Sequence, residues 1–94
     1  MAEKLTKEIT LVNTYGLHVR PAGLFAKTAS MFDATIFVEK DGNVVSGKSI
    51  MALMTLEATC GTKLKIIAEG PQAEQALAEL TALIERKFDI PDER

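Results

Sequence analysis

The chain has 94 residues, of which 47% are hydrophobic and 26% charged, and its formal net charge at pH 7 is −2. This length suits one domain around a single core. The near-neutral charge argues against binding to nucleic acid or to an anionic membrane, and the longest purely apolar run, Ile50 to Met54, is far too short to cross a bilayer.

The same composition favours a protein of the cytoplasm. Cys60 is the only cysteine, so no internal disulfide can form, and no Cys/His pair has the spacing of zinc ligands. We therefore expect no metal and no cofactor. The N-terminal segment MAEKLTKEIT lacks the apolar region of a signal peptide. We expect one domain over residues 1–94, with a solvated tail from about residue 89.

The first half of the chain predicts a strand, a helix and a hairpin. Leu5 to Val12 is rich in β-formers, although Lys7 interrupts its apolar face. From about Val19 to Phe32 the apolar spacing becomes helical. Ala34 to Glu39 alternates like a strand, and the hairpin signal Asp41-Gly42 joins it to a return strand over Asn43 to Ser46.

The second half predicts a short helix, a strand and a long helix. The helix covers Lys48 to Leu56, and Leu64 to Ala68 alternates as the strand. Gly70-Pro71 is expected to open the last helix, with the proline in its first turn. The apolar stripe of that helix consists of Ala73, Ala76, Leu77, Leu80, Leu83, Ile84 and Phe88.

The resulting order, β-α-β-β-α-β-α, predicts an α+β fold. Its first six elements match the split βαβ arrangement, in which helices cover one face of a four-stranded antiparallel sheet. Because that arrangement carries many unrelated functions, the function has to be inferred from the site.

The only histidine, His18, lies where the first helix is expected to begin. The backbone N–H groups of Val19 and Arg20 then have no acceptor within the helix and, with the helix dipole, favour an anion. Arg20 adds a guanidinium suited to phosphate oxygens, and Pro21 stiffens the first turn. Together these groups suit a phosphohistidine. The commoner alternative for such residues is a capping or solvated histidine beside a solvated arginine.

The segment Gly47 to Glu57 is too apolar for a short surface helix. Helical spacing places Leu53 and Leu56 on one side, and Ile50, Met51 and Met54 on another. Only the leucine side can be fully buried against a one-sided sheet, so the other three side chains are expected to form an exposed patch. The alternative is that all five are core residues. Ser49 is a natural N-cap for this helix.

Two segments resemble the HPr family, the histidine-containing phosphocarriers of the bacterial phosphotransferase system. They are Gly16-Leu17-His18-Val19-Arg20-Pro21-Ala22, which is similar to the active-site signature, and Lys48-Ser49-Ile50-Met51-Ala52-Leu53-Met54, which is similar to the regulatory segment. The resemblance runs from about Leu5 to Phe88. It implies the HPr-like open-faced sandwich with three helices on one face.

The resemblance also implies a role for each residue. His18 would accept a phosphoryl group from Enzyme I and pass it to an EIIA-type protein, while Arg20 and the amides of Val19 and Arg20 hold the phosphate. Such a carrier is not itself an enzyme and is expected to act as a monomer. Its docking surface would consist of Val19, Gly23, Lys27, Ile50, Met51 and Met54.

Ser49 matches the serine that HPr kinase/phosphorylase modifies in many members, which implies regulation and a transcriptional regulator as a partner. The alternative is a mainly regulatory module that acts through Ser49. A further alternative is a small scaffold in which the histidine segment only caps a helix. Two residues depart from the family pattern. Tyr15 stands where relatives commonly have a small polar residue, and Glu57 stands where they often have glycine.

Overall fold

The computed structural model describes residues 4–90. Within these residues the chain forms four strands, three α-helices and one 3-10 helix, in the predicted order. The elements are β1 (Lys4–Thr10), α1 (Val19–Ala29), β2 (Thr35–Lys40), β3 (Asn43–Ser46), α2 (Ile50–Met54), β4 (Lys63–Glu69), α3 (Ala73–Glu85) and the 3-10 helix η1 (Lys87–Asp89). None of the helices in this range is long and apolar enough to cross a membrane.

The four strands form one antiparallel sheet in the order β1-β4-β2-β3. The late strand β4 lies between β1 and β2, so it joins the two halves of the chain. The β2–β3 hairpin has the predicted two-residue turn. Lys40 pairs with Asn43, and both Asp41 (φ 52°) and Gly42 (φ 86°) adopt the left-handed backbone that a type I′ turn requires.

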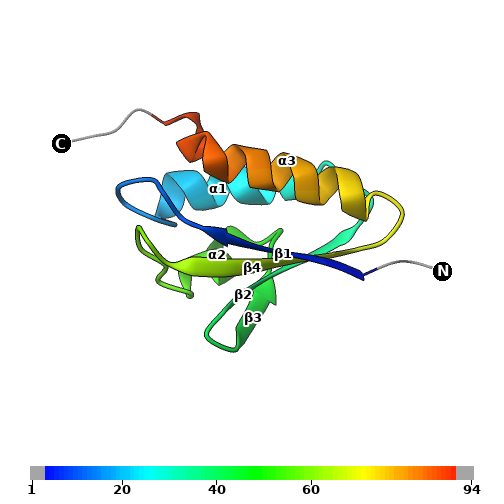
Figure 1. Ribbon diagram of the computed structural model, residues 1–94, viewed down its shortest axis with the longest axis horizontal. Coiled ribbons are helices and arrows are strands. Elements are labelled where there is room, and N and C mark those ends of the chain that lie inside the picture. The colour runs from blue at the N-terminus through cyan, green and yellow to red at the C-terminus, as the bar shows by residue number, and fades with distance from the viewer. Residues whose placement is uncertain (1–3, 91–94) are drawn as a thin grey trace.

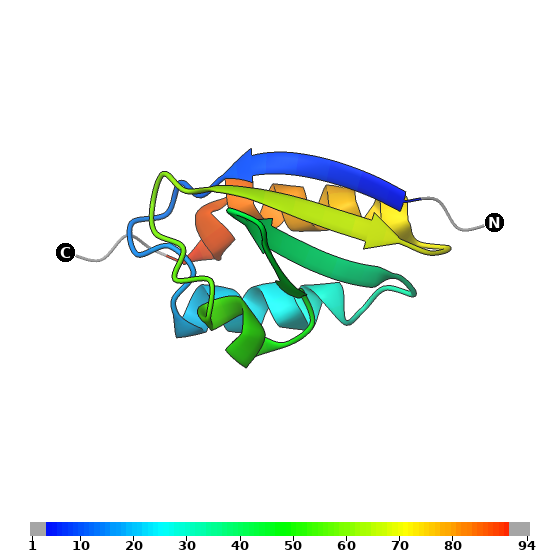
Figure 2. The same ribbon diagram turned by 90° about the horizontal axis from the view of Figure 1, so that it is seen from below.

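The helices cover one face of this sheet, which confirms the predicted α+β sandwich. Figure 1 shows α1 and α3 side by side above the strands, and Figure 2 shows α2 next to α1. Helix α3 packs on β1 and β4, while α1 contacts both other helices. The largest fully buried side chains lie between these layers: Leu11, Phe25, Ile36, Val38, Leu53, Leu64, Ile66, Leu80, Ile84 and Phe88.

Lys7 interrupts the apolar face of β1 without disturbing the sheet. The residue pairs with Ile66 and therefore faces the helix side, but β1 is an edge strand and Lys7 is exposed. Its side chain lines a groove beside α3 together with Glu74 and Glu85. The long alkyl chain of a lysine can cover apolar surface while its ammonium group stays in water.

Two helices are shorter than predicted. Helix α1 ends at Ala29 instead of Phe32, because the chain turns there: the N–H of Ser30 donates to Ala26 O, and that of Met31 to Thr28 O. Phe32 still packs against the core from this turn. Helix α2 covers Ile50–Met54 instead of Lys48 to Leu56, because Ser49 caps its N-terminus.

The prediction that Pro71 lies in the first turn of the last helix is wrong. Helix α3 begins at Ala73, and Pro71 lies in the preceding turn. Gln72 fixes the start of the helix through two hydrogen bonds to Asp33, which lies in the connection between α1 and β2. Its side-chain Oε1 accepts from the N–H of Asp33 (2.7 Å), and its own N–H donates to Asp33 O (3.0 Å).

The last helix ends before Phe88, although the sequence predicts that Phe88 belongs to the apolar face of this helix. Helix α3 stops at Glu85, and Lys87, Phe88 and Asp89 adopt left-handed backbone with φ of 56°, 59° and 56°. This turn carries the Phe88 ring into the core. At the start of the predicted tail, Asp89 is exposed and accepts a hydrogen bond from Arg86 Nε (3.1 Å), and Ile90 packs against the core. Residues 91–94 of that tail lie outside the described residues.

Candidate functional site

His18 is the N-cap residue of α1, as predicted. Its backbone is extended (φ −78°, ψ −173°), and its carbonyl accepts the first hydrogen bond of the helix from Ala22 N (2.9 Å). The imidazole is half-buried and makes no capping hydrogen bond. The ring therefore lies at the N-terminus of α1, and the side chain of His18 does not cap the helix.

A tightly held turn leads the chain to His18. Gly16 has φ 65°, and a Cβ on it would overlap the carbonyl oxygen of Ala58 and lie 2.7 Å from Thr59 Cα. The next residue, Leu17, donates its N–H to Ala58 O (2.9 Å). Only glycine fits both this backbone conformation and this close approach.

Asn13, which is not among the predicted site residues, stabilises the same turn. This side chain is 7% exposed, and its Nδ2 donates to Gly16 O at 2.7 Å. The N–H of Gly16 in turn donates to the backbone oxygen of Asn13 (3.2 Å). An asparagine three positions before a glycine is a known turn signal and could have identified it.

Tyr15 lies at the tip of this turn and contacts the functional ring. The centroids of the Tyr15 and His18 rings are 5.9 Å apart, and the ring planes are 87° apart, an edge-to-face arrangement. Tyr15 stays 51% exposed. The departure from the family pattern at this position thus places an aromatic ring beside the imidazole.

Arg20 and Val19 occupy the exposed side of the first turn of α1, and Pro21 is buried beneath them. No acidic residue lies in this turn, so no carboxylate there neutralises the positive end of the helix. A nucleophilic ring, a helix N-terminus and a guanidinium thus come from three consecutive residues. This combination suits a phosphoryl group.

The exposed patch predicted on the second helix is present. Leu53 is fully buried and Leu56 nearly so, whereas Ile50, Met51 and Met54 are exposed, Met51 by 80%. The patch continues onto α1, since a Cβ added to Gly23 would lie 3.8 Å from Ile50 Cδ1. We call this surface the α1–α2 patch; its residues are Val19, Gly23, Lys27, Ile50, Met51 and Met54.

Both ends of α2 are tied down by side chains. Ser49 Oγ accepts from the N–H of Ala52 (3.1 Å), which confirms the predicted cap. Lys40 Nζ donates to Leu56 O (2.9 Å) just beyond the helix, a contact that the sequence pattern did not predict. Glu57 follows with φ 51°, the left-handed conformation that glycine adopts most easily, so the chain leaves α2 through a strained residue.

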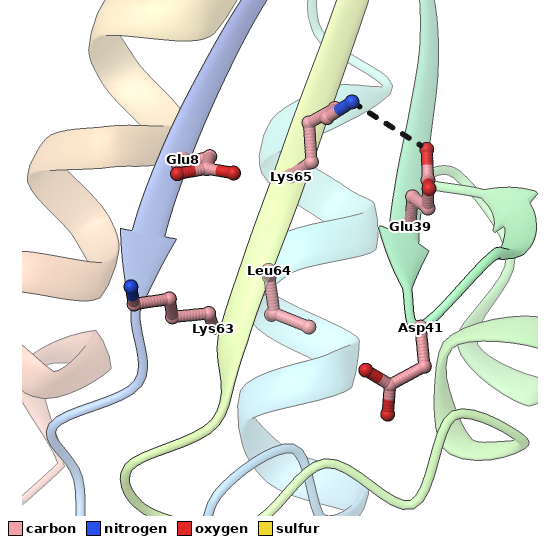
Figure 3. A pocket seen from close by; sticks show the side chains of 6 residues that line it. All are labelled: Glu8, Glu39, Asp41, Lys63, Leu64 and Lys65. Carbon is pink, nitrogen blue, oxygen red and sulfur yellow. Dashed lines mark ion pairs between the residues drawn. The ribbon is translucent and has the colours of Figure 1, made fainter.

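A depression lined mostly by charged side chains lies away from His18 and the α1–α2 patch, and it involves none of their residues. Figure 3 shows it at the lower ends of β1, β4 and β2, lined by Glu8, Glu39, Asp41, Lys63, Leu64 and Lys65. Lys65 Nζ lies 3.9 Å from Glu39 Oε1. Mixed charges of this kind favour no single ligand. Across residues 4–90, no group of three or more His, Cys, Asp or Glu side chains could hold a metal ion.

The comparison with protein families shows the family to which this chain belongs. The family model described as "PTS HPr component phosphorylation site" matches residues 5–86. The chain belongs to the HPr family. HPr proteins are phosphocarriers of the phosphotransferase system, and the relatives of this chain include both HPr and the HPr-like protein Crh.

Several members of this family are similar to the chain over most of its length. The phosphocarrier protein HPr of Borreliella burgdorferi is 49% identical over 79 residues, which are 84% of this chain and 92% of that protein. The HPr-like protein Crh of Bacillus subtilis is 43% identical over 72 residues, 77% of this chain and 85% of Crh. The crystal structure of HPr from Thermoanaerobacter tengcongensis has a TM-score of 0.89 and 45% identity, and the match covers 93% of this chain and 98% of that one.

Proposed function

We propose that this HPr protein accepts a phosphoryl group on His18 from phospho-Enzyme I and passes it to an EIIA-type acceptor. The observation that carries the proposal is the imidazole of His18, half-buried at the N-terminus of α1 and not engaged in capping the helix. The exposed Arg20 on the same turn and the absence of a carboxylate there support it.

The transfer needs little covalent chemistry from the carrier. A nitrogen of the His18 ring attacks phosphorus, and the bond from phosphorus to the histidine of Enzyme I breaks. The EIIA histidine later attacks the same phosphorus, and His18 leaves. The amides of Val19 and Arg20 and the Arg20 guanidinium stabilise the charge on the phosphoryl oxygens during both steps.

The α1–α2 patch is the proposed docking surface for both partners. It is apolar at Val19, Ile50, Met51 and Met54, carries the cation of Lys27, and lies next to His18 through Val19. Methionine side chains adapt to different surfaces, which suits a carrier that meets several partners in the cytoplasm. We propose that the carrier acts as a monomer. Because it must dissociate from one partner to reach the next, its contact with each partner is expected to be small and transient.

The direct test is incubation of the protein with Enzyme I and phosphoenolpyruvate. We expect an acid-labile phosphate on His18 and none on His18→Ala. Arg20→Ala should slow the transfer by about 10²-fold, since it removes a charged donor to the phosphoryl oxygens. An unphosphorylated wild type, or a label that persists in His18→Ala, would exclude the proposal.

We also propose that phosphorylation of Ser49 by HPr kinase/phosphorylase weakens docking. Ser49 directly precedes Ile50 of the patch, and a phosphoserine there would carry about −1.5 to −2 charges. We predict that Ser49→Asp lowers the rate of phosphorylation by Enzyme I through a higher KM. Ser49→Ala is the matched control, because it loses the cap without adding charge. An equal KM for the two variants would contradict the electrostatic explanation.

A second candidate, a mainly regulatory module, is favoured by the similarity to Crh. In that case phosphorylated Ser49 would bind a transcriptional regulator and His18 would have no role. Binding of a regulator that survives His18→Ala but is lost in Ser49→Ala, together with no labelling by Enzyme I, would support this candidate instead of the carrier.

A further inference from the structure

Tyr15 is the feature of the site that the proposed function does not yet use. Its ring makes an edge-to-face contact with the His18 ring, with centroids 5.9 Å apart. Such pairs contribute beyond the area that they bury, because the positive edge of one ring meets the negative face of the other. The contact therefore favours one orientation of the imidazole over others.

The backbone around Tyr15 keeps this contact in place. Two hydrogen bonds between Asn13 and Gly16 close the turn, and the buried Asn13 side chain donates one of them to Gly16 O. Leu17 then ties the chain to Ala58. Tyr15 thus extends from a turn that is fixed to the body of the protein, and His18 is fixed in turn as the N-cap of α1. Both partners of the ring contact have a defined backbone.

We infer that Tyr15 is a positioning residue for phosphoryl transfer: its ring holds the His18 imidazole in one orientation at the N-terminus of α1. This inference rests on the proposed function. The ring has to meet phosphorus along a defined direction while the phosphoryl oxygens face the helix N-terminus and Arg20. Restricting the ring before the reaction saves the entropy that would otherwise be lost in the transition state. We assign this role to the aromatic ring, because the contact between Tyr15 and His18 is a contact of the two rings.

The ring contact itself is tested by NMR without any partner protein. We expect the two carbon-bound protons of the His18 ring to show a ring-current displacement in the wild type and in Tyr15→Phe. Both protons should lose this displacement in Tyr15→Leu, which keeps an apolar side chain at the position. Tyr15→Ser serves as a second variant in case the leucine disturbs the turn. Unchanged shifts of these two protons in both Tyr15→Leu and Tyr15→Ser would overturn the inference.

The effect on reactivity is tested with two phosphoryl donors. Phosphoramidate transfers its phosphoryl group to an imidazole with release of ammonia and needs no docking, whereas Enzyme I does. With both donors, Tyr15→Leu should react about two- to tenfold more slowly, the factor that corresponds to one aromatic pair, and Tyr15→Phe should react like the wild type.

The outcomes separate this inference from the proposed function. A rate that falls with Enzyme I alone would mean that Tyr15 acts in docking, and a loss in Tyr15→Phe would mean that the hydroxyl is the active group; either result overturns the positioning role. If Enzyme I fails to phosphorylate the wild type, the proposed function fails, and the NMR shifts and the phosphoramidate rates still decide whether Tyr15 orients the ring.

Discussion

Asn13 is the only polar residue within residues 4–90 that is buried as a whole, and it lies five residues before His18 in the loop that leads to the site. Its Nδ2 holds Gly16 O, while its Oδ1 has no hydrogen-bond partner among the described residues. A buried amide that uses its donor but not its acceptor contributes less than a fully paired one. The contribution of the Asn13 side chain to stability therefore comes from its hydrogen bond to Gly16 O.

We predict that Asn13→Ala lowers the free energy of unfolding by about 1–2 kcal/mol, because Gly16 O loses its partner. Asn13→Asp should cost more at pH 7, because a buried carboxylate cannot donate to that carbonyl. Part of this loss should return below about pH 5, where a protonated carboxyl group can donate. Urea unfolding at both pH values measures the effect, and equal losses at the two pH values would contradict the assigned hydrogen bond.

Glu57, which follows the C-terminal end of α2, has a strained backbone conformation that lowers the stability of the fold. Its φ of 51° costs an L-amino acid about 1–2 kcal/mol, and glycine recovers part of this despite its greater freedom in the unfolded chain. We predict that Glu57→Gly raises the free energy of unfolding by about 0.5–1 kcal/mol. Glu57→Gln keeps the side chain without the charge and should change nothing. Equal stability of the two variants would count against backbone strain.

At the scale of elements, α2 depends on its surroundings. A helix of five residues is too short to form alone, since isolated helices below about 12 residues are marginal in water. Burial of Leu53, the Ser49 cap and the lysine contact beyond its last turn hold it against the sheet. The exposed side of the helix is thus presented as a firm surface, although its sequence has little helical stability of its own.

Helix α1 carries a glycine that the fold does not require. A Cβ at Gly23 would make only an ordinary contact with Ile50, at 3.8 Å. We predict that Gly23→Ala raises the free energy of unfolding by about 0.5–1 kcal/mol, because alanine loses less backbone entropy in a helix. Gly16→Ala is the matched contrast and should lower it by about 2 kcal/mol or more, given its positive φ and the overlap with Ala58. Thermal unfolding of both variants tests the contrast; a destabilising Gly23→Ala would refute it.

At the scale of the molecule, the last element closes the core. Phe88 is 1% exposed, and its 3-10 turn contacts both α1 and α3. The chain tolerates three consecutive left-handed residues to bring this ring inward. The C-terminal turn therefore couples the helix that carries His18 to the helix that covers β1 and β4.

We predict that Phe88→Ala lowers the free energy of unfolding by about 3–5 kcal/mol, the cost of removing a buried phenyl ring. Phe37→Ala is the control: Phe37 lies on the uncovered face of the sheet, is 38% exposed, and should cost about 1 kcal/mol. Chemical denaturation of both variants measures the difference. Similar losses for the two rings would show that the C-terminal turn contributes little to the core.

Much of the fold could be predicted from the sequence because its signals are local. Alternation and β-forming residues identified the strands, and helical spacing identified the helices. Asp41-Gly42 defined a hairpin turn that the structure reproduces residue for residue. The helix ends were less accurate. Residues such as Phe32 and Phe88 have the correct spacing for a helix, yet they reach the core from turns, and spacing cannot distinguish these two routes.

The sequence by itself determined the element order, the N-cap position of His18, and the division of α2 into a buried and an exposed side. Only the tertiary structure decided that Tyr15 packs on the imidazole, that Asn13 and Lys40 support the two functional segments, and that Gln72 and Phe88 set the ends of α3. The physical reason is the separation along the chain of the residues that interact. Propensity and periodicity depend on neighbours along the chain, whereas these contacts depend on side-chain direction or on segments that meet only after the sheet has formed.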